Sequence, residues 1–395
     1  MAGVRPSGFA LFQYGFRPFF LLVGLWAVVA VPVWVWLYAS GSAPPARLPA
    51  FLWHGHEMLF GFVGAAIAGF LLTAVPSWTS SRGYAGAPLI LLVLLWVAGR
   101  IAPVAAAFWP AWVAGVLELA FLPALAIILA PPLLRTANRN RAMLAVLTVL
   151  WLTDVAFIVG MYTEDALLAQ RALRLAIDIV LILVTIIGGR IVPAFTANAL
   201  RRHGETLHVV SRPWLDPLVI TSMVAIAIVD AVRPDSMLSG WLAAIAAAAH
   251  ALRLSGWRGL RTLDEPILWI LHIGYAWLPI GLGLKALWLL GEVSWSVHWL
   301  HALTTGVFAT MILAVTTRAT LGHTGRPLVV SRTTSIAYIV LTAAVLVRVF
   351  GPAVSGLDYH VTVTVAGALW TLAFLLYLAV YAPILTRPRS DGRPG

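Results

Sequence analysis

The stretch WHGHEMLFGFVGAAIAGFLLTAVP, residues 53–76, brings two imidazoles and a carboxylate to the entrance of a long apolar run. A run of about 20 apolar residues is long enough to cross the hydrocarbon core of a bilayer as a helix. Ionisable groups at that depth are costly, so they usually face a partner, a cavity or a metal rather than lipid. The stretch therefore predicts a membrane helix that carries His54, His56 and Glu57 for a functional reason.

The composition extends this interpretation to the whole chain of 395 residues. Apolar residues make up 61% and charged residues 10%, with a mean hydropathy of +0.93. This excludes a water-soluble globule, because such proteins average about 25% charged residues. We attribute the net charge of +11 to arginines at helix ends and expect no nucleic-acid partner. The absence of cysteine excludes iron–sulfur clusters, covalently attached haem, thiolate-bound copper and disulfides.

The apolar runs predict an all-α polytopic membrane bundle of about twelve transmembrane helices, forming one domain over residues 1–395 with no soluble domain. Arginines concentrate in the joints on one side, which includes both chain ends, so both termini are predicted to be cytoplasmic. The predicted spans are 16–38, 55–76, 88–108, 111–134, 142–161, 166–190, 214–232, 238–256, 267–290, 298–318, 333–350 and 361–385.

Histidines gather at the outer ends of these spans. His54 and His56 precede one span, His298 and His301 begin another, and His360 begins the last. Four imidazoles on two spans at one depth favour a metal site, although an interfacial histidine bonded to water is the alternative for each. Residues two apart point in nearly opposite directions on a helix, so His54 and His56 are expected to serve different centres unless one caps the helix end. His298 and His301 share a face, and we interpret His360 as interfacial.

Two further histidines lie deeper in the spans. His272 sits in a nearly all-apolar segment, and His250 lies among alanines. We predict that His272 is a haem ligand or a member of a proton relay, with a satisfied core histidine as the alternative. His250 is a similar candidate with less support. His323 follows the tenth span on the cytoplasmic side.

The carboxylates within the predicted spans are Glu57, Glu118, Asp154, Asp178 and Asp230. A buried carboxylate must find a cation or a proton, and both outcomes suit proton delivery. Glu57 directly follows the histidines and is our candidate for a proton relay or for supporting a metal ligand. Arg100 and Lys285 are the other intramembrane charges, and the sequence does not indicate their partners.

Arg17, Arg190 and Arg318 each end a span near the cytoplasmic side. Anchoring by the positive-inside rule explains each of them on its own. The functional alternative is an ion pair with the carboxylates of a cofactor, such as haem propionates, for which the guanidinium fork is suited. Gly188 and Gly189 favour the close approach of another group at this point.

A short internal repeat relates two of the helices. His56 to Gly61 and His301 to Gly306 share the pattern H-x4-G, and both helices enter from the outer side. Two such helices could flank a flat macrocycle, with the glycine allowing close approach. The match is short, and chance similarity between apolar helices is the preferred explanation.

Several motifs together resemble the NnrS family. They are the segment 53–61, GFRPFF at 15–20, GRIVPAFT at 189–196, LHIGYAW at 271–277, and HAL at 301–303 followed by RATLGHTGRP at 318–327. They cover essentially the whole chain, and the combination is specific although no single motif is. The resemblance implies a multi-pass protein of the bacterial inner (cytoplasmic) membrane that contains haem and copper. It also implies a place in the nitric-oxide response of denitrifying and pathogenic bacteria.

The resemblance also implies which residues serve the cofactors, which we expect to be non-covalent b-type haem and copper. The implied cofactor residues are His54, His56, His272, His301 and His323, with Glu57, Arg190 and Arg318 in support and Arg17 and Arg326 among the cofactor-binding arginines. His298 and His250 lie outside these motifs and stay candidate metal ligands. Which histidine serves which metal is not implied.

Three functions are compatible with these residues. The preferred prediction is an enzyme that reduces nitric oxide to nitrous oxide at a haem–metal centre, with Glu57 assisting proton delivery and electrons from quinol or a separate donor. The second is a non-catalytic protein that binds or senses nitric oxide or protects against it. The third is a transporter, because twelve spans with glycine and proline breaks also describe many carriers.

Overall fold

A computed structural model describes residues 10–42, 49–104, 110–136, 139–206, 208–354 and 357–393. Over these ranges the chain is helical and contains no strand, which confirms the predicted all-α class. The helices of the amino-terminal half are α1 (Phe16–Ser40), α2 (Ala50–His56), η1 (Glu57–Val63), α3 (Gly64–Thr79), α4 (Ala87–Ile101), α5 (Ala111–Leu119), α6 (Phe121–Arg135), η2 (Arg139–Arg141), α7 (Ala142–Tyr162) and α8 (Ala166–Arg202).

The carboxyl-terminal half continues in the same manner. Its helices are α9 (Leu215–Val232), α10 (Met237–Ser255), η3 (Gly259–Thr262), α11 (Pro266–Gly291), η4 (Ser294–His298), α12 (Trp299–His301), η5 (Ala302–Ala309), α13 (Thr310–His323), α14 (Arg332–Phe350), η6 (Gly351–Ala353) and α15 (Tyr359–Thr386). η1 and η5 are π-helices, and the other η segments are short 3₁₀-helices.

Within the described ranges, eleven helical segments are long and apolar enough to cross a membrane, so the chain is a polytopic membrane protein. The predicted span 88–108 differs from this set. Its helix α4 is apolar but ends at Ile101, and residues 105–109 of that span lie outside the described ranges. The helix at the predicted span 166–190 is longer than predicted. This helix, α8, passes through Pro193 and continues to Arg202.

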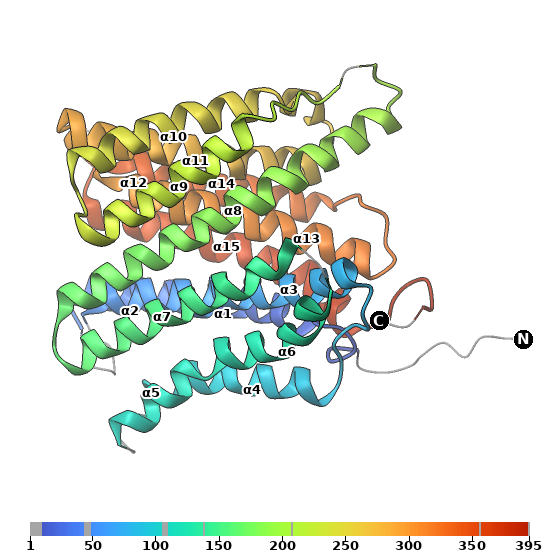
Figure 1. Cartoon of the computed structure of the whole chain (residues 1–395), viewed down its shortest axis with the longest axis horizontal. Coiled ribbons are helices and arrows are strands. Elements are labelled where there is room, and N and C mark those ends of the chain that lie inside the picture. The colour runs from blue at the N-terminus through green and yellow to red at the C-terminus, as the bar shows by residue number, and fades with distance from the viewer. Residues whose placement is uncertain are drawn as a thin grey trace, which may run out of the picture. The chain divides into compact units, whose positions relative to one another are not determined.

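By its internal contacts the chain forms two compact units. The first consists of Met1–Ala176, Arg318–Leu328 and Phe374–Gly395, and the second of Ile177–Thr317 and Val329–Ala373. Over the described residues both are built from helices, as Figure 1 shows. The prediction of one domain over 1–395 stays a prediction.

In the first unit, α3 packs against α1 and α6, and α4 packs against α5 and α6. Its two ends are tied together: the amide of Ala10 donates to the carbonyl of Thr386 (2.8 Å), and Nη1 of the buried Arg17 donates to the carbonyls of Leu385 (3.0 Å) and Arg387 (2.7 Å). The last carbonyls of a helix lack partners within it, so this guanidinium satisfies the end of α15. The beginning of α1 and the end of α15 thus lie next to each other. The prediction that both termini are on the same side of the membrane requires this.

In the second unit, α10 packs against both α9 and α11, and α11 also packs against η5 and α14 (Figure 1). A buried ion pair crosses this packing: Lys285 of α11 contacts Asp230 of α9, which also accepts from the hydroxyl of Ser239 on α10. The ammonium of Lys285 lies 5.0 Å from the ring centroid of Trp299. Asp230 is therefore the partner of Lys285 that the sequence left open.

A π-helix occurs in each unit, and the two begin at corresponding positions of the short repeat. η1 and η5 start directly after His56 and His301. In each, the glycine of the pattern packs against a tryptophan of another helix: Gly61 against Trp26, and Gly306 against Trp277. π-Helices are rare and are frequently found at functional sites. The two segments therefore share an unusual backbone feature in addition to their sequence pattern.

Candidate functional site

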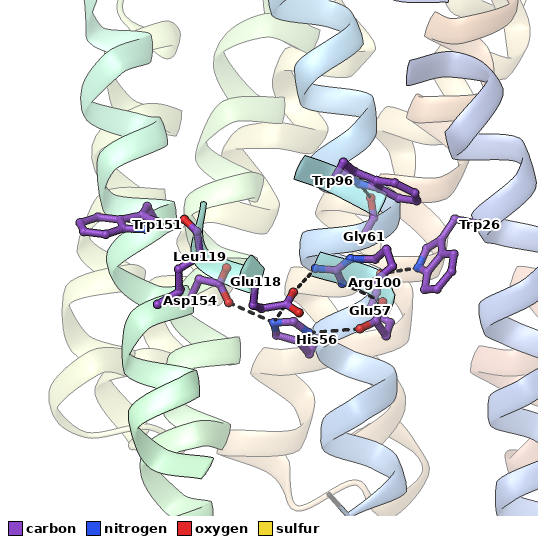
Figure 2. A network of polar contacts seen from close by, with 10 residues as sticks. All are labelled: Trp26, His56, Glu57, Gly61, Trp96, Arg100, Glu118, Leu119, Trp151 and Asp154. Carbon is purple, nitrogen blue, oxygen red and sulfur yellow. Dashed lines mark hydrogen bonds and ion pairs between the residues drawn. The ribbon is translucent and has the colours of Figure 1, made fainter. Parts of the chain in front are cut away.

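A network of buried charged side chains lies in the first unit (Figure 2). His56 ends α2 and Glu57 begins η1, while Arg100 comes from α4, Glu118 from α5 and Asp154 from α7. All five side chains belong to residues that are at most 7% exposed. Since an unpaired buried charge is strongly destabilising, each of them must find its partners within this network.

Arg100 lies at the centre of the network. Its Nη1 donates to Oε2 of Glu57 (2.7 Å), and its Nη2 donates to Oε1 of Glu118. Nε2 of His56 lies 3.0 Å from Oδ1 of Asp154, and Nδ1 of His56 lies 3.5 Å from Oε1 of Glu57. One guanidinium and one imidazole therefore share three carboxylates, as Figure 2 shows.

Two indole groups hold the backbone of η1. Nε1 of Trp26 donates to the carbonyl of Glu57 (3.3 Å), and Nε1 of Trp96 donates to the carbonyl of Gly61 (3.1 Å), both visible in Figure 2. A buried carbonyl near an irregular turn needs such an outside donor. The tryptophans therefore stabilise the π-turn that brings Glu57 to Arg100.

Replacing Gly61 with alanine is expected to destabilise the protein by about 1–3 kcal/mol, because overpacking a dense core costs that much. The added methyl would lie 2.8 Å from Cδ1 of Trp26 and would push the indole away from the Glu57 carbonyl. Thermal unfolding of the detergent-purified protein measures the change. Gly64→Ala is the control, because a Cβ there comes no closer than 3.7 Å to the carbonyl oxygen of Leu59. Equal stability of the two variants would contradict the prediction.

A second polar network joins α10 and α11 in the second unit. Nη1 of Arg253 donates to the carbonyl of Thr185 (2.9 Å) and to the hydroxyl of Tyr275 (3.0 Å), and its Nη2 lies 2.6 Å from Oδ1 of Asp216. Nδ1 of His250 lies 2.8 Å from the same Tyr275 hydroxyl. His250 is fully buried, and its Nε2 has no hydrogen-bond partner.

His272, on α11, has a free lone pair. Its Nε2 lies 2.9 Å from Oγ1 of Thr196, and that hydroxyl donates its only proton to the carbonyl of Val192 (2.9 Å). The ring must therefore donate through Nε2, which leaves Nδ1 as an unprotonated acceptor. Nδ1 is buried and has no partner. A Cβ at Gly259 would lie 2.6 Å from it, so glycine at this position lets the backbone pack closely against the imidazole ring.

The close approach predicted at the glycine pair occurs, and the approaching groups are side chains of the protein itself. A Cβ on Gly188 would lie 3.3 Å from the ring of Tyr275, and one on Gly189 would collide with the guanidinium of Arg253. The side chain of Arg190 is exposed. The two glycines thus make room for the second network.

Two other predicted metal ligands lie among aromatic side chains of the first unit. His54 stacks on Trp34 with 4.3 Å between ring centroids. His323 stacks on Tyr14 at 6.1 Å and lies 5.6 Å from the ring of Phe16. His54 and His56 therefore face different surroundings, as their spacing predicted.

In the second unit, His298 and His301 belong to one cluster, as their spacing of three also predicted. Nη2 of Arg348 donates to Nε2 of His301 (3.1 Å) and to the hydroxyl of Tyr359 (2.9 Å). The ring of His298 stacks on Tyr359 with 5.8 Å between centroids. Arg348 and Tyr359 thus connect the two histidines.

The four arginines predicted to bind a cofactor lie in different surroundings. Arg17 caps α15, Arg190 is exposed, and Arg318 is buried. Arg326 donates to the carbonyl of Thr324 (3.4 Å), and burial, followed by the charge of Arg387, lowers its pKa. A role for these four residues in cofactor binding stays a prediction.

The side chains can be compared with the two expected cofactors. Among the residues that the structure describes, no group of three or more His, Asp or Glu side chains is arranged to hold a metal ion, and copper binding stays a prediction. A metal on His56 would require Asp154 or Glu57 to turn away. Haem iron takes only one or two axial protein ligands, and the unpaired nitrogens of His272 and His250 fit that need.

Sequence reasoning missed the convergence of Arg100, Glu118 and Asp154 with His56 and Glu57. Each was recognised as a charge inside an apolar span. Such charges almost always pair with one another. The signal in the sequence was therefore the presence of opposite charges at similar depths in different spans. It could not say which pairs meet, because helix packing decides that.

Fold and site together define a polytopic helical membrane protein that holds histidines and charged side chains inside the helix packing of each unit. The family comparison is more specific. The family model described as NnrS protein matches residues 10–389, so the chain belongs to the NnrS family, as its motifs predicted. A comparison with curated proteins finds no match.

Proposed function

We propose that this protein removes nitric oxide by reducing it to nitrous oxide in the bacterial cytoplasmic membrane. Membership of the NnrS family suggests a role in the nitric-oxide response. The reaction consumes two molecules of nitric oxide, two electrons and two protons, and it yields one nitrous oxide and one water. It therefore needs a redox cofactor, an electron donor and a source of protons inside the membrane.

The observation that carries this proposal is the free lone pair of His272. A buried imidazole whose second nitrogen is fixed by a hydrogen bond is the arrangement that orients metal ligands in proteins. We assign His272 as the residue that holds a b-type haem through Nδ1, with His250 as a second axial candidate. When bound, haem supplies a redox-active iron that binds nitric oxide.

The chain's own residues would orient the ligand and supply protons. Thr196 sets the tautomer of His272, and Gly259 places no side chain against the ring. Glu57, buried next to His56 and Arg100, is the proposed proton donor. Electrons would come from quinol or a separate donor, because the cysteine-free chain carries no iron–sulfur cluster. We assign no residues to copper, because the described residues contain no group of three or more His, Asp or Glu side chains arranged for a metal.

Purified protein with a reductant should consume nitric oxide and form nitrous oxide, and His272→Ala should lose both its haem and this activity. The optical spectrum measures haem content, and gas analysis measures nitrous oxide. His203→Ala is the matched control, because His203 is exposed and lies 3.1 Å from Glu265 near the end of α8. It should keep wild-type haem content and activity.

Other outcomes select the alternatives. A saturable loss of nitric oxide that needs no electron donor and forms no nitrous oxide would indicate a binding or protective protein. A clean preparation without haem absorbance would favour a transporter. Unchanged haem content in His272→Ala would show that His272 is not the haem ligand.

A further inference from the structure

The chain folds back after α15 and is fastened to the turn that follows α13. The amide of Ser390 donates to the carbonyl of Thr324 (3.0 Å), and its hydroxyl donates to the carbonyl of Gly325 (2.9 Å). Nη1 of Arg389 donates to the carbonyl of His323, the last residue of α13 (2.7 Å). These contacts lie within the first unit and fix residues 389–390 beside the turn.

This fold-back brings together three arginines, Arg326, Arg387 and Arg389, which we call the arginine cluster. Arg326 interacts electrostatically with Arg387, and the buried Arg17 interacts in the same way with both Arg326 and Arg389. Among the described residues, Asp391 is the one carboxylate that pairs with the cluster, and Arg389 holds it through Nε (2.9 Å) and Nη2 (2.6 Å). Arg326 and Arg387 therefore carry two positive charges that no carboxylate of the described residues balances.

Helix ends account for part of this arrangement but not for all of it. α13 and α15 both end here, and the carboxyl-terminal end of a helix carries roughly half a negative charge. Arg389 covers the end of α13 and Arg17 covers the end of α15, since each donates to the last carbonyls of its helix. Arg326 donates to the carbonyl of Thr324 over a long 3.4 Å, and Arg387 is exposed. The charges of Arg326 and Arg387 thus exceed what the helix ends neutralise.

Guanidinium groups that gather at a membrane boundary are suited to bind phosphate. The cluster lies where α1 begins and α15 ends, at the level of the span ends on the predicted cytoplasmic side. Lipid phosphates lie at this level, and basic pockets at the cytoplasmic ends of membrane helices bind anionic head groups. A guanidinium can donate two parallel hydrogen bonds to one phosphate. Arg326 and Arg389 are partly buried, so the site is more sharply defined than a patch of solvated arginines.

We propose that Arg326, Arg387 and Arg389 bind the phosphate of an anionic phospholipid. The site goes beyond the proposed function, because it requires neither haem nor nitric oxide. Arg17 is a positioning residue: it holds the carbonyls of Leu385 and Arg387 and thereby the segment that carries two of the three arginines. The carboxylates of haem are the other anions predicted for Arg17 and Arg326, and inorganic phosphate offers the same chemistry as a lipid head group. The experiment therefore separates these three anions.

Native mass spectrometry of the full-length detergent-purified protein, titrated with phosphatidylglycerol, measures the binding. The wild type should bind this lipid more tightly than zwitterionic phosphatidylcholine. Arg326→Gln together with Arg387→Gln should weaken phosphatidylglycerol binding about 30-fold, because each basic residue near a membrane surface contributes about a factor of five. Arg135→Gln together with Arg141→Gln is the matched control, because both are exposed arginines of the same unit on the same predicted side. It should bind phosphatidylglycerol like the wild type.

Equal binding of the two lipids by the wild type would overturn the proposal even if a variant failed to fold. Equal losses in the double variant and in its control would also overturn it, because diffuse surface charge would then explain the binding. Inorganic phosphate that displaces the lipid at an equal concentration would indicate a free-anion site instead. A double variant that loses haem but keeps its lipid would assign the cluster to the cofactor and end the proposal.

Discussion

Replacing Arg100 with methionine is expected to cost the protein about 3–5 kcal/mol of stability, the effect of removing one partner from a buried ion pair. Methionine fills a similar volume but donates no hydrogen bond. It would leave Glu57 and Glu118 without their common donor and the network without its guanidinium. Unfolding of the purified protein in detergent, followed by circular dichroism, measures the loss.

Two companion variants separate the charge effect from simple damage to the helix. Arg171→Met changes an exposed arginine of α8 and should alter stability by less than about 0.5 kcal/mol. Adding Glu57→Gln to Arg100→Met should restore part of the loss, because groups in one network are not additive. If Arg100→Met is as stable as the wild type, the buried charges are not held as described here.

Replacing Gly259 with alanine should weaken haem binding about 10–100-fold, the range found when the surroundings of a metal ligand are disturbed. The new methyl group would lie 2.6 Å from Nδ1 and 2.8 Å from Cγ of His272, against the face of the ring, and would displace the imidazole. Haem absorbance per mole of purified protein, and titration of the apoprotein with haem, measure the effect. The fold should persist, because η3 is a short 3₁₀-helix between α10 and α11.

A matched glycine on α11 provides the control. A Cβ on Gly283 meets no atom within 4 Å, so Gly283→Ala should bind haem like the wild type. Thr196→Val should resemble Gly259→Ala, because the ring of His272 loses the hydroxyl that fixes its tautomer. Full haem content in both Gly259→Ala and Thr196→Val would show that His272 is not the ligand.

The helical class could be predicted from the sequence because hydrophobicity acts locally. Long apolar runs such as 55–76 and 267–290 have no stable form in a bilayer other than a helix that satisfies its own backbone. Helix ends were less predictable. α8 runs on to Arg202 through Pro193, and Val192, Ala199 and Leu200 of this continuation are buried, which the apolar run alone did not indicate.

The candidate site could be predicted only in part. His54, His56, Glu57 and His272 were identified because an ionisable group in an apolar run is unusual in itself. The partners of Arg100 could not be found in this way, since Glu57 and Glu118 belong to different helices. The π-turn after His56 was also hidden, because composition does not distinguish it from an ordinary helical turn.

The sequence by itself determined that this chain is a membrane-embedded helical protein of the NnrS family with histidines and charges inside its spans. The reason is that the length of an apolar run and the residues of a motif can each be recognised within one continuous stretch of the chain. Only the tertiary structure decided that Arg100 pairs with Glu57 and Glu118, that Asp154 faces His56, and that Nδ1 of His272 is left free. The reason is physical: each of these contacts joins atoms from separate helices, and the packing of those helices sets which groups meet.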